Sequence, residues 1–138
     1  MKVAADANVL LSAVLGGRAR LVLNHPDIEE VLTTEHTFAE VREYTLVLGR
    51  KKKLALDSLL LTVASLPVTQ VARVQYAAKI AQADHRIGWR DPDDIELLAL
   101  ALHAEIPLWS NDNDFENCGV ERLTTAELLG KLGIFEGK

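Results

Sequence analysis

The chain has 138 residues, a formal net charge of −5 and 49% apolar residues, which predicts one folded domain spanning residues 1–138. No apolar run approaches a membrane span, the first residues do not resemble a signal peptide, and the only cysteine is Cys118, so a cytoplasmic protein without disulfides is expected. The acidic balance argues against a passive nucleic-acid binder, but it is compatible with an enzyme whose carboxylates hold a divalent metal.

The first half of the chain predicts two buried strands, each followed by helices. Residues 3–5 form a short apolar run that stops at Asp6, and residues 30–33 form a second one followed by Thr34, a helix-capping residue type. Helices are predicted over residues 8–15, 18–24 and 54–65, and from Glu35 onward. The apolar face of the Glu35 helix comprises Phe38, Val41, either Tyr44 or Thr45, and Leu48.

The second half of the chain repeats this alternation. Strands are predicted at residues 68–71, 107–110 and 120–123, and helices over residues 75–87 (ended by Gly88), from Asp91 to about Ala104, and from a Thr124 or Thr125 cap to Gly133. Asp91 followed by Pro92 is a typical helix start. Strands that alternate with helices predict an α/β fold, here a three-layer α/β/α sandwich with a mainly parallel central sheet.

Four carboxylates fall at equivalent places in this pattern, at strand ends or early in the helices that follow. They are Asp6, Glu40, Asp94 and Asp112. Because the carboxyl ends of parallel strands share one edge of the sheet, the four side chains can converge there. A set of oxygen ligands without sulfur or imidazole suits Mg²⁺ or Mn²⁺.

Taken singly, most of these acids have a simpler interpretation. Asp94 lies in the first turn of a helix, where the helix dipole favours a carboxylate. Asp112 and Asp114 are typical turn residues, and Glu40 alone is typical of a solvated helix surface. Asp6 is different, because an acid directly after a buried strand is costly unless it has a partner. The functional interpretation therefore depends on convergence.

Two motifs resemble those of PIN domains. The run Asp6-Ala7-Asn8-Val9 is similar to the family's opening motif, Asp-Thr-Asn followed by a hydrophobic residue. The Asp91-Pro92-Asp93-Asp94 helix start and the later Pro107-Leu108-Trp109-Ser110-Asn111-Asp112-Asn113-Asp114-Phe115 run resemble its closing motif. The resemblance covers essentially the whole chain in the right order, and it implies a PIN-like fold.

Carried over by position, the resemblance implies that Asp6, Glu40, Asp94 and Asp112 are catalytic metal ligands for Mg²⁺ or Mn²⁺. It further implies that Asn8 orients Asp6 and that Ser110 supplies the hydroxyl near the metal. Ala7 stands where the family usually has Thr, which removes a supporting hydrogen bond rather than a ligand.

Two ligand positions stay open at this point. Asp114 is an alternative to Asp112, and Asp93 is an alternative to Asp94. Helix spacing favours Asp94, because it shares a face with the apolar positions four and seven residues later.

The resemblance also implies an activity and partners. PIN domains of this kind are metal-dependent ribonucleases that hydrolyse RNA phosphodiesters with metal-activated water, most often as the toxin of a toxin–antitoxin pair. RNA substrate, a protein antitoxin and a homodimer are therefore expected. The basic run Arg50-Lys51-Lys52-Lys53 is a candidate RNA contact, although cations also favour the C-terminal end of a helix without any ligand.

Competing functions are a non-catalytic PIN-like RNA-binding module and a haloacid-dehalogenase-like phosphatase. The phosphatase family needs Asp-x-Asp at its first motif, and this chain has Asn8 at the second of those acidic positions. Phosphorylation-receiver domains have a similar size, but they require a catalytic lysine that is not evident in this sequence. All four expected carboxylates are present, so no sequence feature indicates a loss of catalytic activity.

Overall fold

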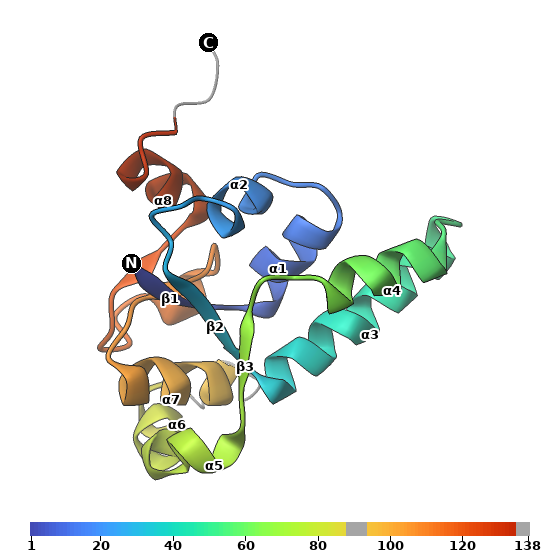
Figure 1. The fold of residues 1–138 in the computed structure, drawn as a ribbon. Coiled ribbons are helices and arrows are strands. Elements are labelled where there is room, and N and C mark those ends of the chain that lie inside the picture. The colour runs from blue at the N-terminus through green and yellow to red at the C-terminus, as the bar shows by residue number, and fades with distance from the viewer. Residues whose placement is uncertain (88–93, 135–138) are drawn as a thin grey trace.

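A five-stranded parallel sheet with the order β3-β2-β1-β4-β5 organises the chain in the computed structural model, which describes residues 1–87 and 94–134 (Figure 1). The strands are β1 Lys2–Ala5, β2 Glu30–Thr34, β3 Thr69–Val71, β4 Leu108–Trp109 and β5 Arg122–Leu123. The central strand β1 places Val3 opposite Val31 and Ala5 opposite Trp109. Because all pairings are parallel, the carboxyl ends of the strands lie along one edge.

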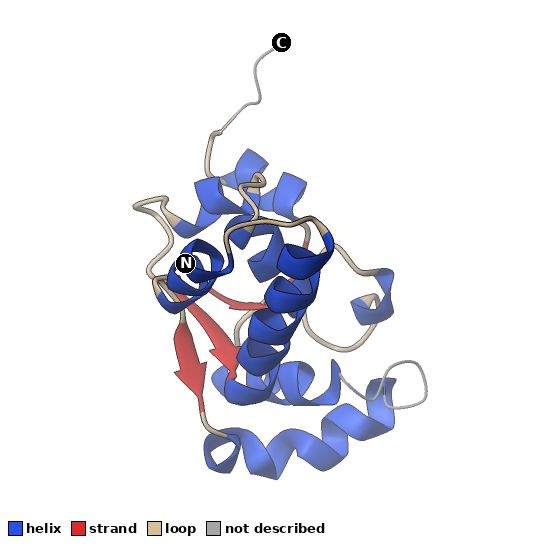
Figure 2. Ribbon diagram, turned by 90° about the vertical axis from the view of Figure 1, so that its right-hand side faces the viewer, coloured by secondary structure: helices blue, strands red, loops and turns tan. Residues whose placement is uncertain are grey.

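Helices cover both faces of the sheet (Figure 2). The first layer contains α1 Ala7–Val14, α2 Ala19–Leu23, α3 Glu35–Lys51 and α8 Thr125–Lys131. The second layer contains α5 Arg73–Tyr76, a 3-10 turn at Ala77–Lys79, α6 Ile80–Ile87 and α7 Ile95–Ala104. The expected three-layer α/β/α sandwich is confirmed.

Side-chain alternation along β1 explains why the protein has two cores. Val3 and Ala5 pack into the core beneath α1, α2 and α8, whereas Ala4 packs into the core beneath α7. Successive side chains of a strand point to opposite faces, so a strand buried on both sides is apolar throughout. This is the reason that the short run before Asp6 contains only apolar residues.

The helix α4 Leu56–Ala64 packs against α3, and the two helices project from the sheet as a hairpin (Figure 1). Gly49 permits this contact, because a Cβ there would lie 2.6 Å from Cδ2 of Leu56. At 17 residues α3 is the longest described helix, and none of the described helices is both long and apolar enough to cross a membrane.

Several element boundaries differ from the sequence expectation. The helix predicted over residues 75–87 begins at Arg73 and is interrupted by the 3-10 turn after Tyr76. No glycine or proline marks this break; Tyr76 is buried there and its hydroxyl binds Glu96 of α7, a contact distant in sequence. The predicted Gly88 helix end, the Asp91 cap and Asp93 lie outside the described residues. Asp94 directly precedes α7 and has helical backbone angles, with φ −87° and ψ −7°.

Candidate active site

A pocket of about 110 Å³ lies at the carboxyl edge of the sheet, where β1 and β4 end and α3 begins. Its lining residues are Asp6, Ala7, Asn8, Glu40, Tyr44, Asp94 and Asp112. The structure therefore brings the four sequence-predicted carboxylates to a single place, although they come from four separate segments of the chain.

Asp6 is the most buried of these acids, at 6% exposure. It caps α1, since its Oδ1 accepts a hydrogen bond of 2.9 Å from the backbone N–H of Val9, and its Oδ2 accepts one from the Ser110 hydroxyl. Burial raises the pKa of Asp6, and this effect exceeds the lowering by the bonds from Ser110 and Val9; the nearby Asp112 charge raises the pKa further. The protein thus holds a carboxylate where its charge is disfavoured, as is common at functional sites.

Ser110 links Asp6 to the acidic loop after β4. While its hydroxyl donates to Asp6, its oxygen accepts a bond of 3.0 Å from the backbone N–H of Asp112. The Oδ1 of Asp112 in turn accepts a bond of 2.9 Å from the N–H of Asp114, which caps the short 3-10 turn Asn113–Phe115. This chain of bonds fixes the loop relative to the end of β1.

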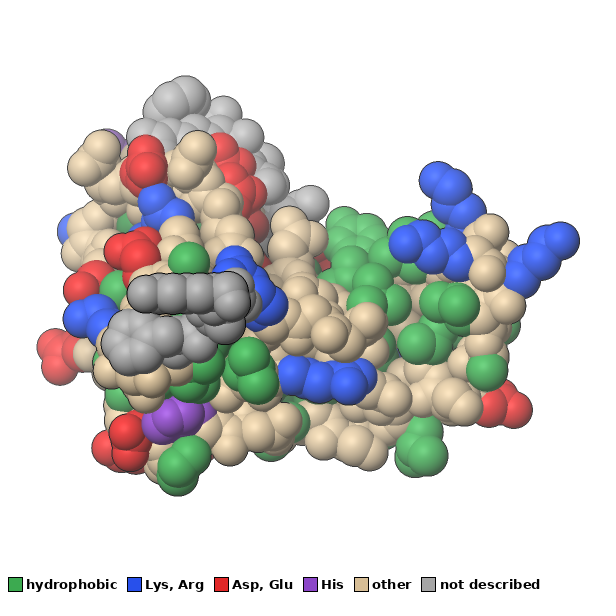
Figure 3. Space-filling model, turned by 90° about the horizontal axis from the view of Figure 1, so that it is seen from above, with side chains coloured by type: hydrophobic (Ala, Val, Ile, Leu, Met, Phe, Trp, Pro, Cys, Tyr) green, Lys and Arg blue, Asp and Glu red, His purple; other side chains and the backbone are tan. Residues whose placement is uncertain are grey.

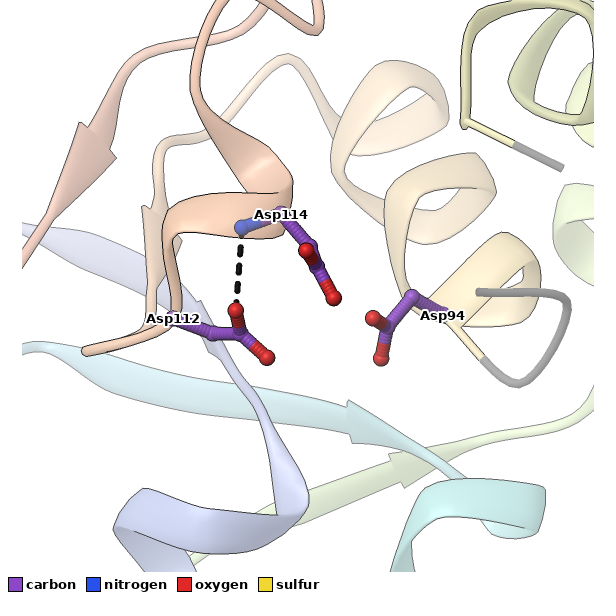
Figure 4. Close-up of side chains that lie close together, drawn as sticks. All are labelled: Asp94, Asp112 and Asp114. Atoms are coloured by element: carbon purple, nitrogen blue, oxygen red, sulfur yellow. Dashed lines mark hydrogen bonds between the residues drawn. The ribbon is translucent and has the colours of Figure 1, made fainter. Parts of the chain in front are cut away.

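Asp94, Asp112 and Asp114 form the tightest acidic group that the described residues contain. One oxygen from each carboxylate lies within 4.8 Å of the others, and Figure 4 shows the three side chains turned toward a common space. All three are half-buried. Asp114 joins this triad, so the structure keeps both Asp112 and Asp114 near Asp94, whereas Asp6 and Glu40 line the pocket outside the triad.

Glu40 reaches the pocket from α3 and is 22% exposed in its side chain. One turn before it, His36 places Nε2 at 3.2 Å from Oε1 of Glu40. One turn after it, Tyr44 also lines the pocket. Neither neighbour is among the site residues predicted from the sequence. Their spacing of four residues from Glu40 is the signal that identifies them, because such positions share a helix face.

Of the other residues predicted to act at the site, Asn8 lies at the pocket and the basic run lies away from it. Asn8 is exposed at the pocket wall, and its backbone N–H helps lower the pKa of Asp6. The basic run Arg50–Lys53 is exposed at the tip of the α3–α4 hairpin. At 1.5 Å per residue, this run begins about 15 Å along α3 from Glu40, outside the pocket.

The donor set fits a hard divalent cation. The pocket and the triad offer carboxylate oxygens, the ligands that Mg²⁺ and Mn²⁺ prefer, and the triad brings three of them within 4.8 Å of one another. Oδ2 of Asp94 is a buried oxygen without a hydrogen-bond partner, although the residue has other interactions. A cation would also offset the mutual repulsion of the clustered negative charges.

Comparison with solved structures shows where this fold occurs. The VapBC2 structure from Rickettsia felis, bound to a promoter DNA fragment, matches with a TM-score of 0.68 and 12% identity, covering 90% of this chain and 98% of that one. A toxin–antitoxin complex from Klebsiella pneumoniae matches with a TM-score of 0.62 and 16% identity over 89% and 97% of the two chains. VapC20 from Mycobacterium tuberculosis, described as a toxin that cleaves the sarcin–ricin loop, matches with a TM-score of 0.59 and 19% identity over 86% and 95%.

At these identities, the structural matches show the fold alone. No curated relative matches the chain by sequence. A family model described as PIN domain, however, matches residues 4–133, which is nearly the whole chain. The match contains both motifs on which the resemblance was based and the segments that build the carboxylate pocket. The chain belongs to the PIN domain family.

Proposed function

We propose that the chain is a metal-dependent endoribonuclease that acts at the carboxylate pocket. The observation that carries this proposal is the convergence of Asp6, Glu40, Asp94 and Asp112 on one pocket at the carboxyl edge of a parallel sheet. Membership of the PIN family supports the same function. It leaves the haloacid-dehalogenase alternative without support.

Asp94 and Asp112 are the proposed principal ligands, because they belong both to the pocket and to the compact triad. Asp6, Glu40 and Asp114 complete the oxygen environment. A bound Mg²⁺ or Mn²⁺ supplies activation of water and stabilisation of charge on the reacting phosphate. Without a cation, the negative charge of the carboxylates would repel a phosphodiester. Substrate binding at the pocket therefore requires the metal.

The chain's own contribution is positioning. The Ser110 hydroxyl and the Val9 N–H hold both oxygens of Asp6, so that carboxylate cannot rotate freely. The Asp114 N–H holds Asp112 in the same way. Fixed ligands lose little entropy when a cation and a phosphate bind, which is the advantage of a preorganised site.

The biological role that we propose is that of a toxin with a protein antitoxin as its partner. One structure similar in fold to this chain is a toxin–antitoxin complex, and another is of a toxin described as cleaving the sarcin–ricin loop. In this proposal residues 1–138 act as one nuclease domain in the cytoplasm, as a homodimer, and the exposed Arg50–Lys53 run contacts RNA phosphates. A gene for a DNA-binding antitoxin directly upstream would support this role.

Cleavage of RNA by the purified protein tests the catalytic proposal. We expect cleavage with Mg²⁺ or Mn²⁺, none with chelator, and none for Asp6→Ala or Asp94→Ala. Asp84→Ala, which removes an exposed carboxylate of α6, serves as the matched control and keeps full activity. In parallel, either ion should raise the unfolding temperature of the wild type, and Asp94→Ala should lose most of that increase.

Each competing function gives a different result. RNA binding without cleavage, with every divalent ion, would favour a non-catalytic binding module. Hydrolysis of an aryl phosphate without RNA cleavage would contradict the ribonuclease proposal. Equal loss of activity in Asp84→Ala and Asp94→Ala would show that the pocket is not the active site.

A further inference from the structure

Tyr44 is an exposed aromatic residue at the edge of the carboxylate pocket. It lines the pocket one turn after Glu40 on α3, and it is 43% exposed. The other aromatic residues in the described part of the chain are at most 5% exposed. They are Phe38, Tyr76, Trp109 and Phe115. Tyr44 is therefore the described aromatic ring that faces solvent, and it does so beside the proposed active site.

Core packing does not account for this ring. The neighbouring Thr45 occupies the inward position, is 0% exposed and donates its hydroxyl to the Val41 carbonyl at 2.7 Å. An aromatic ring stabilises a fold mainly by being buried, so a half-exposed ring contributes less than the same ring in a core. The exposed ring lines the pocket, where a ligand that enters can contact it.

The face of α3 that carries Tyr44 also carries a pocket carboxylate and a cationic side chain, two features expected along a surface that binds an RNA strand. Glu40, Tyr44 and Lys51 are spaced by four and seven residues and share one side of the helix. The rise of 1.5 Å per residue separates them by about 6 Å and about 10 Å along the axis. Figure 3 shows cationic side chains gathered at the far end of the α3–α4 hairpin, where the Arg50–Lys53 run lies.

We propose that Tyr44 is the residue that stacks on the nucleobase adjacent to the scissile phosphate when RNA occupies the pocket. This inference rests on the proposed function. An aromatic ring stacks on any base that is unpaired and splayed out, but it cannot reach a base paired within an A-form duplex. Phosphates farther along the strand would then meet the basic tip of the hairpin.

Binding of a fluorescently labelled single-stranded RNA tests this role. Calcium is used in the assay, because carboxylates bind it but at longer distances than magnesium, which separates binding from cleavage. We expect Tyr44→Ala and Tyr44→Leu to weaken binding by roughly 5- to 100-fold, the usual effect of removing one stacking ring. Tyr44→Phe should bind like the wild type, because it keeps the ring.

Val74→Ala is the matched control. Val74 is 83% exposed on α5, which lies in the other helix layer, and its truncation should leave binding unchanged. Thermal unfolding of each variant shows whether it is folded, and Tyr44→Leu retains apolar volume if the alanine variant does not fold.

A series of RNAs with one abasic nucleotide locates the stacked base. Removal of one particular base should weaken binding by the wild type, and Tyr44→Ala should be insensitive to that same removal, because the two changes delete the same interaction. The wild type should also prefer single-stranded over fully paired RNA, and Tyr44→Ala should lose most of that preference. Equal binding by Tyr44→Ala and wild type would overturn the inference, as would a Tyr44→Phe variant as weak as Tyr44→Ala.

The assay separates this inference from the proposed function. RNA binding that depends on Tyr44 without cleavage in magnesium or manganese would contradict the ribonuclease activity and retain the stacking role. Metal-dependent cleavage with no effect of Tyr44 substitution on binding would support the ribonuclease activity and contradict the stacking role. A wild type that binds no single-stranded RNA would contradict both.

Discussion

The hydroxyl of Ser110 donates to Asp6 across 104 positions of sequence, and this bond joins the ends of two adjacent parallel strands. Both residues are buried, and the Ser110 oxygen also accepts the N–H of Asp112. One hydroxyl thus holds a buried carboxylate and fixes the acidic loop. Ser110 therefore fixes the positions of Asp6 and Asp112 relative to each other.

Replacing Ser110 by alanine should destabilise the metal-free protein by about 2 kcal/mol, because a buried carboxylate loses a charge-assisted donor. Urea unfolding in the presence of chelator measures this free energy. Ser65→Ala is the control, since the exposed Ser65 hydroxyl donates only to the Leu61 carbonyl of its own helix. That change should stay within about 0.5 kcal/mol. Equal losses in the two variants would contradict the role given to Ser110.

Asp6→Asn should stabilise the metal-free protein at neutral pH. The pKa of Asp6 is raised in the folded state, chiefly by burial, so the folded state binds its proton more tightly than the unfolded state. The stability that this group contributes is present below its unfolded pKa of 3.8 and is lost as pH rises through the folded value. Asparagine has no charge to bury and still caps α1.

The measurement is the unfolding free energy of wild type and Asp6→Asn from acidic to neutral pH, with chelator present. The advantage of the variant should grow as pH rises and shrink as pH falls. If the hydrogen bonds from Ser110 and Val9 outweighed burial, the variant would instead lose stability at neutral pH.

Local signals in the sequence account for most of the fold. The apolar run that stops at Asp6 predicted β1, and Thr34 and Thr124 are both caps in the structure, with Thr124 forming a full capping box with Glu127. These features depend on neighbouring residues, so one sequence contains them. Thr125, the alternative cap, instead accepts a hydrogen bond from the indole of Trp109.

Contacts between distant segments were harder to predict. The pattern of α3 left Tyr44 and Thr45 equivalent, because both border the apolar stripe, and only the packing of α3 on the sheet decides which is buried. Sequence likewise predicted that four acids converge, but not that Asp114 joins Asp94 and Asp112 in the tightest group. That grouping depends on the hydrogen bond that turns the loop after Asp112.

Tyr76→Phe should cost about 2 kcal/mol of stability, because the Tyr76 hydroxyl donates to Glu96 at 2.7 Å in a largely buried setting. Burial, followed by Glu96, raises the pKa of Tyr76 above its usual 10.0, so its contribution persists through neutral pH and is lost only in strong alkali. Urea unfolding at neutral pH checks the value. Ser65→Ala, at an exposed hydroxyl, should leave stability within about 0.5 kcal/mol.

Gly119→Ala should be more damaging than substitution of Gly16 or Gly130, two other glycines that the structure describes. Gly119 has a φ of +96°, and a Cβ there would lie 1.2 Å from Nη1 of Arg86, so the methyl group and the guanidinium cannot coexist. Displacing Arg86 breaks its 2.8 Å bond to the Cys118 carbonyl, which ties α6 to the loop after Asp114. Backbone strain and the lost bond together should cost about 2–3 kcal/mol.

Two other glycines separate these effects in the same unfolding experiment. Gly16 has a φ of +90° but nothing within 4 Å of an added Cβ, so Gly16→Ala should show the backbone strain alone, about 1–2 kcal/mol. Gly130 lies within α8 with open space around it, so Gly130→Ala should stabilise by up to about 1 kcal/mol. If Gly119→Ala cost no more than Gly16→Ala, the Arg86 contact would contribute nothing. A larger cost, with a smaller metal-induced rise in unfolding temperature, would show that Arg86 holds the acidic loop in place.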